Sequence, residues 1–158
     1  MSKMRFRYPL EPVLLTRQWA LDALLQTLAE HNAGIAEHAR RQAATQAAYA
    51  AASAGWQALT AAREAQSVQG FLLASRYLAD VAARMRDEAD EMARLAAARD
   101  EVIAQVVAAR RAVEAVEQHR DDMQRAFVRQ RLSADLKLAD DQWNTLQTGK
   151  TGAASHGH

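Results

Sequence analysis

The sequence predicts an all-α fold, a long antiparallel two-helix coiled-coil hairpin, and three observations carry this prediction. Apolar residues recur with a seven-residue period from Phe71 to Phe127, and no glycine or proline interrupts them. A shorter run with the same period begins at Leu14. The chain of 158 residues is rich in alanine and has Gly 6 and Pro 2, a composition typical of long, closely packed helices.

The first helix is predicted over about residues 10–62. Pro9 and Pro12 suit a helix entrance, where a missing N–H costs nothing, and Glu11 complements the positive end of the helix dipole. Its main heptad row consists of Leu14, Leu21, Leu28, Ile35, Gln42, Tyr49 and Trp56. A weaker second row consists of Leu10, Leu24, Leu25, His31, His38, Ala39 and Ala52. The basic and aromatic lead, residues 1–8, is expected to be frayed.

A single reversal of the chain is expected at about residues 62–68, between Gly55 and Gly70, with Ser67 as a candidate N-cap. The second helix is predicted over about 69–146. The tail, residues 147–158, is expected to be disordered. Residues 1–146 therefore form the predicted hairpin domain.

The second helix carries the two apolar rows that a coiled-coil seam requires. The first row is Phe71, Leu78, Met85, Met92, Arg99, Val106, Val113, Arg120 and Phe127. The row three residues further on is Ala74, Val81, Glu88, Leu95, Val102, Ala109, Val116, Met123 and Gln130. Fourteen of these eighteen positions are apolar, so this helix is expected to supercoil with a partner helix.

The alternative architecture is a parallel homodimer through the second helix. The hairpin is favoured because the first helix carries a matching stripe that would otherwise stay in water. At 1.5 Å per residue the first helix measures about 75 Å and the second about 115 Å. The second helix must therefore extend past the first, or bend.

Composition and charge exclude several classes of function. The net charge is +1 and the two signs alternate along the helices, which disfavours nucleic-acid binding. The chain has no cysteine and no apolar run near the roughly 20 residues that span a bilayer. We therefore expect a cytoplasmic protein with no direct membrane insertion.

The sequence offers no convincing catalytic, cofactor-binding or metal site, and we predict that the chain is not an enzyme. Residues 149–151, GKT, look like the end of a phosphate-binding loop, but Asn144 replaces its first glycine and a helix precedes it. His31 and His38 lie seven residues apart, too far along a helix to share an ion. The carboxylates lack the cleft that acid–base catalysis requires.

Four seam positions are polar or charged: Gln42, Glu88, Arg99 and Arg120. Such residues commonly specify register, which is the favoured interpretation. The other interpretation is that the seam opens there to another protein.

Four of the nine aromatic residues lie near the expected turn: Tyr49, Trp56, Phe71 and Tyr77. They form either an exposed patch that binds a protein or a plug that closes the turn end of the hairpin. The sequence favours neither.

The opening MRFRYPLEPVLLTRQ, the two-helix pattern and the single reversal resemble the FliJ/YscO-type stalk proteins of flagellar and virulence type III secretion systems. The resemblance spans about residues 5–146. It implies a cytoplasmic stalk or adaptor at the export apparatus that links the hexameric export ATPase to the cytoplasmic domain of the export gate protein. Export chaperones are further partners that the resemblance implies.

The resemblance also implies contact residues. The residues matching the export-gate contact are Gln42, Tyr49, Tyr77 and Val81, with Phe71 nearby, although Ser53 stands where a second aromatic of the first helix is expected. The candidates for the ATPase contact are Arg5, Arg7, Arg17, Arg129 and Arg131. The alternative function is a generic structural coiled-coil scaffold, including a homodimer.

Overall fold

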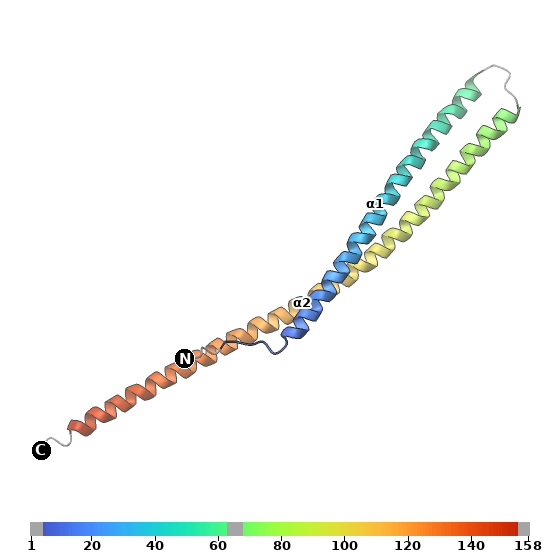
Figure 1. Ribbon diagram of the computed structural model, residues 1–158. Helices are drawn as coiled ribbons and strands as arrows, with labels where there is room; N and C mark the ends of the chain where they lie inside the picture. The colour runs from blue at the N-terminus through green and yellow to red at the C-terminus, as the bar shows by residue number, and fades with distance from the viewer. Residues whose placement is uncertain (1–4, 63–67, 155–158) are drawn as a thin grey trace. The chain divides into compact units, whose positions relative to one another are not determined.

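The computed structural model describes residues 5–62 and 68–154, which form two helices and, in these ranges, no strand. Helix α1 spans Glu11–Ala61 (51 residues) and α2 spans Val68–Ala154 (87 residues). Trp56 of α1 packs on Phe71 of α2, and His38 of α1 lies beside Glu88 of α2. An earlier residue of α1 therefore meets a later residue of α2, which makes the two helices antiparallel. Figure 1 shows the two helices side by side and antiparallel. The predicted all-α two-helix hairpin is confirmed.

The chain divides into two compact units, and each contains part of both helices. One unit is residues 20–109, and the other combines residues 1–19 with 110–158. In the first unit the buried apolar side chains are Val81, Val102 and Val106. In the second they are Tyr8, Leu14 and Val113. Each unit therefore has a thin apolar seam of its own.

The heptad rows predicted for the second helix lie in these seams. Seventeen of the eighteen positions are buried or half-buried, including Glu88, Arg99 and Arg120, and the exception is Gln130. All seven residues of the main row of α1 are also at least half-buried. A seven-residue period therefore identified the packing face of both helices correctly.

The second row of α1 was predicted less well. Leu10, Leu25 and Ala39 are exposed, whereas Thr45 is only 7% exposed. The true row keeps a strict three-residue offset from the main row: Leu24, His31, His38, Thr45, Ala52 and Leu59. The polar character of Thr45 hid its place in this row, since an apolar pattern does not include it.

Residues 5–10, which we call the N-terminal arm, pack against α2. The prediction of a frayed lead over residues 1–8 is therefore wrong for residues 5–8, and residues 1–4 lie outside the described residues. The Phe6 and Phe127 ring centroids lie 5.6 Å apart. The Tyr8 ring is buried, and its hydroxyl oxygen lies 2.6 Å from Nδ1 of His119. The backbone N–H of Glu11 donates to the Tyr8 carbonyl oxygen at 3.2 Å, which joins the arm to α1. Burial of two aromatic rings outweighs the usual freedom of a chain end.

The predicted turn over 62–68 and its N-cap Ser67 lie almost entirely outside the described residues, which resume at Val68. The expected helix end at 146 is wrong, because α2 continues to Ala154. No proline breaks this stretch, and Thr145, Thr148 and Thr151 each donate a hydroxyl hydrogen bond to the carbonyl four residues earlier. The two glycines there, at about 1 kcal/mol each, do not end the helix.

The last part of α2 is solvent-exposed along its length. Every residue from Val128 to Gly152 is exposed, and we call this stretch the C-terminal overhang. Figure 1 shows it, in orange to red, as a single helix.

Candidate interaction surfaces

A buried polar cluster interrupts the seam of the first unit at Glu88. Nε2 of His38 lies 2.8 Å from the Glu88 backbone carbonyl oxygen, which can only accept, so Nε2 carries the proton. The Gln42 amide also donates to this oxygen, at 3.4 Å. The Thr45 hydroxyl lies 2.8 Å from Oε1 of Glu88 and 3.1 Å from the Arg41 carbonyl oxygen. Because these contacts need one alignment of the helices, the cluster favours the register interpretation of Gln42 and Glu88.

One atom of this cluster is unsatisfied. Oε2 of Glu88 is buried and has no hydrogen-bond partner in the described part of the chain. A buried polar atom without a partner costs about 1–3 kcal/mol. The cluster therefore contributes specificity of alignment at a cost in stability.

Replacing Glu88 by Leu is therefore expected to raise the free energy of unfolding by about 1 kcal/mol, because it removes the unsatisfied oxygen. His38 and Gln42 bond to the backbone of residue 88 and keep their acceptor. The measurement is chemical denaturation followed by circular dichroism. Glu101→Leu, at an exposed position of the same helix, is the control and should change stability by less than about 0.5 kcal/mol. A clear loss of stability in Glu88→Leu alone would contradict this account.

An apolar patch covers the outer face of the first turns of α2, and we call it the turn-end patch. Its large side chains are strongly exposed: Val68 at 76%, Leu72 at 64%, Leu73 at 67% and Tyr77 at 54%. Leu72 and Leu73 also line a surface hollow with Gln69, Ser75, Arg76 and Ala79. Sequence reasoning missed Val68, Leu72 and Leu73, although their places outside the heptad rows mark them as exposed.

The structure separates the five residues that the resemblance assigned to an export-gate contact. Tyr77 is exposed within the turn-end patch, whereas Val81 is 0% exposed and lies inside the seam. Gln42 is half-buried in the polar cluster. Tyr49 and Phe71 are half-buried, and Phe71 packs edge-to-face on Trp56 at 5.6 Å. Of the five, only Tyr77 offers most of its side chain to a partner. Of the aromatic residues near the turn, Trp56 and Phe71 pack together as a plug, whereas Tyr77 belongs to the exposed patch.

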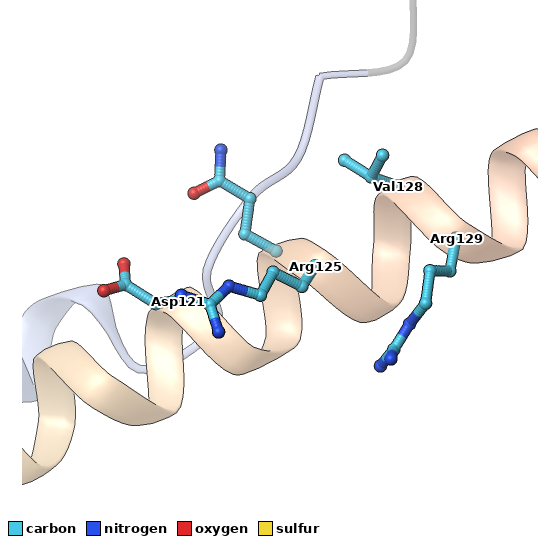
Figure 2. A pocket seen from close by; sticks show the side chains of 5 residues that line it. Asp121, Arg125, Val128 and Arg129 are labelled. Atoms are coloured by element: carbon cyan, nitrogen blue, oxygen red, sulfur yellow. The ribbon is translucent and has the colours of Figure 1, made fainter.

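Exposed arginines lie close in sequence to the two residues that join the N-terminal arm to α2, Phe6 and Phe127. These arginines, which we call the arm cluster, are Arg5, Arg7, Arg125, Arg129 and Arg131. The Phe6–Phe127 ring contact brings Arg5 and Arg7, the neighbours of Phe6, near the segment of α2 that carries the other three. Figure 2 shows Asp121, Arg125, Val128 and Arg129 lining a surface hollow of α2 beside the arm.

The arm cluster includes four of the five candidates for an ATPase contact. The fifth, Arg17, is exposed elsewhere and lines a hollow with Tyr8, Val116 and His119. The positive charge of these exposed arginines suits an acidic partner. Arg125 is the member that sequence reasoning missed.

A short ion pair in the first unit lies outside these surfaces. Nη2 and Nε of Arg94 donate to Oε2 of Glu91 at 2.6 and 3.0 Å. This hydrogen bond, with the charge of Arg94, lowers the pKa of Glu91. A lowered carboxyl pKa stabilises the fold above the unfolded pKa, and this contribution is lost as the pH falls through the folded pKa. Because both side chains are solvent-accessible, the contribution is small.

Other kinds of site have no counterpart in residues 5–62 and 68–154. No group of three or more His, Cys, Asp or Glu side chains there could hold a metal ion. Neither described helix contains a stretch apolar enough to cross a membrane. The exposed arginines and apolar side chains are therefore the features left for a functional proposal.

Comparison with known proteins finds no match: no protein-family model, no curated protein and no solved structure corresponds to this chain. The resemblance to type III secretion stalk proteins therefore stays a prediction from the sequence.

Proposed function

We propose that this chain is a stalk or adaptor of a type III secretion export apparatus, flagellar or virulence-type, that links a hexameric export ATPase to the export gate protein. The arm cluster would bind the ATPase, and the turn-end patch would bind the cytoplasmic domain of the gate. Export chaperones would be further partners. The protein acts at the cytoplasmic face of the apparatus and catalyses no reaction itself.

One observation supports this proposal most directly. The Phe6–Phe127 contact brings the arginines of the arm near the part of α2 that carries Arg125, Arg129 and Arg131, whereas the exposed apolar side chains of the turn-end patch belong to the other unit. A basic surface attracts an acidic partner, and an exposed apolar patch is typical of a protein interface. An adaptor requires two such surfaces of different chemistry.

The alternative is a generic structural coiled-coil scaffold, including a parallel homodimer through the second helix. That dimer would use the same rows of α2 that are already buried in the hairpin, with Val81 and Val102 at 0% and 8% exposure. It would have to displace α1 and expose the main row of α1 to water. We therefore favour the stalk.

The experiment is an assay of ATP hydrolysis by a purified hexameric export ATPase from a type III secretion system. The wild-type chain is expected to bind this ATPase and raise its rate. Arg5→Glu combined with Arg7→Glu should lower the apparent affinity at least about 10-fold, because two favourable charge contacts become repulsive. The measurement is the concentration of the chain that gives half-maximal stimulation.

The matched control is Arg110→Glu combined with Arg111→Glu, an exposed pair on α2 outside the arm cluster. It changes the net charge equally and should leave stimulation unchanged. If the wild-type chain neither bound nor stimulated the ATPase, the stalk proposal would fail. If both double variants lost apparent affinity equally, the effect of the arm cluster would be one of nonspecific charge.

A further inference from the structure

The C-terminal overhang carries an apolar stripe with a heptad pattern of its own. Its members follow one another at spacings of four and three residues: Leu132, Leu136, Ala139, Trp143 and Leu146. The four large side chains are between 59% and 64% exposed. Alternate spacings of four and three define the seam of a coiled coil.

This stripe is not a continuation of the seam that packs against α1. That seam would continue through Ala134, Lys137, Asp141 and Asn144, none of which is a large apolar residue. The new pattern is offset by two residues, about 200° around a helix at 3.6 residues per turn. The overhang therefore presents its apolar stripe on nearly the opposite face of α2 from the seam.

We propose that the overhang binds the overhang of a second copy of this chain as an antiparallel two-helix coiled coil. In such a pair, Leu132 packs against Trp143 of the second copy, and Leu136 packs against Ala139 of the second copy. The two-fold symmetry repeats each contact, so Leu132, Leu136, Ala139 and Trp143 of each copy are covered, whereas Leu146 lies beside Arg129 of the second copy. The two tryptophans provide the large buried side chains that commonly anchor an interface.

The charges of the segment favour its own reversed copy as the occupant. Residues 128–137 contain three basic side chains and one acidic, whereas residues 138–146 contain two acidic and none basic. Antiparallel pairing places the basic half of each copy beside the acidic half of the other. This complementarity favours a second copy over an unrelated helix.

The same charges exclude a parallel pair. Parallel alignment would place Asp135 beside Asp140 of the second copy and would bring the two copies of Arg129 together at the seam. Antiparallel alignment places Asp140 near Ser133 of the second copy instead. Like charges at flanking positions destabilise a coiled coil and set its orientation.

The dimer is expected to be weak and concentration-dependent, because five seam positions span only about 20 Å of helix. An isolated helix this short would be marginal in water. Here α2 already holds the segment in helical form, so association does not have to order it. This proposal is independent of the stalk function.

The experiment is sedimentation equilibrium of the full chain over a series of concentrations. The average mass should rise from the chain mass of 17.4 kDa toward twice that value. Leu136→Glu places a charge in the stripe and should abolish the rise. Leu138→Glu is the matched control, because Leu138 is also 62% exposed but lies off the stripe, and it should keep the rise. A constant monomer mass in the wild type, or equal effects of the two variants, would overturn the proposal.

The orientation of the two copies is tested by disulfide trapping. Any disulfide must form at the introduced positions, because the chain has no cysteine of its own. Leu132→Cys mixed with Trp143→Cys should give a cross-linked dimer on oxidation, whereas each variant alone should give little. Cross-linking of each variant to itself would mean a parallel pair and would overturn the antiparallel arrangement. Circular dichroism of every variant should show unchanged helix content, since both positions are exposed.

Discussion

Replacing Leu14 by Ala is expected to lower the free energy of unfolding of the unit that contains the N-terminal arm by about 2–3 kcal/mol. Leu14 is only 1% exposed, one of the two largest fully buried side chains, and its loss leaves a cavity in a seam with few other apolar groups. The value lies at the low end for buried leucines, because a two-helix seam can partly close the gap. The corresponding fall in melting temperature is about 4–12 °C.

The measurement is thermal unfolding followed by far-ultraviolet circular dichroism. Leu15→Ala is the control, because Leu15 is the adjacent residue on the same helix and is 41% exposed. It removes the same atoms from a surface position and should cost well under half as much. Equal losses for Leu14→Ala and Leu15→Ala would mean that the arm unit does not pack as described.

Replacing Val81 by Asp should be more damaging, costing about 3–5 kcal/mol in the other unit. Val81 is 0% exposed, so the new carboxylate would be buried at a position where the seam normally holds an apolar side chain. Either the seam around residue 81 opens or the group binds a proton, and both outcomes reduce stability. Hydrogen exchange of the amides near residue 81 should show this opening directly.

Tyr77→Asp is the matched control, one helical turn earlier on α2 and 54% exposed. It should change the free energy of unfolding by less than about 0.5 kcal/mol. A variant Val81→Asp that kept the stability of the wild type would contradict the hairpin seam.

This pair of substitutions also bears on the proposed gate contact. If the turn-end patch binds the gate, Tyr77→Asp should weaken binding while leaving the fold intact. Val81→Asp should weaken it only by opening the hairpin, because a buried valine cannot touch a partner. The resemblance assigns both residues to the gate contact, whereas their burial in the structure leaves only Tyr77 accessible to a partner.

A good part of the architecture could be predicted from the sequence because it depends on local periodicity. A seven-residue apolar repeat specifies which face of a helix is buried, whatever the partner. The rows from Phe71 to Phe127 and from Leu14 to Trp56 therefore matched the observed burial closely. The candidate site residues were harder to predict, since Val81 is an ordinary member of a row and Tyr77 lies beside it.

The sequence alone determined the two helices, their buried faces and a single reversal of the chain, because each follows from residue spacing. Only the tertiary structure decided which side chains meet across the seam. Two examples are the contact of His38 with the Glu88 carbonyl and the contact of Phe6 with Phe127. Both depend on how α1 or the N-terminal arm is aligned along α2. The local sequence carries no signal of this alignment, because the residues that meet are far apart in the chain. The same alignment leaves the overhang uncovered, with an apolar stripe on the face opposite its seam.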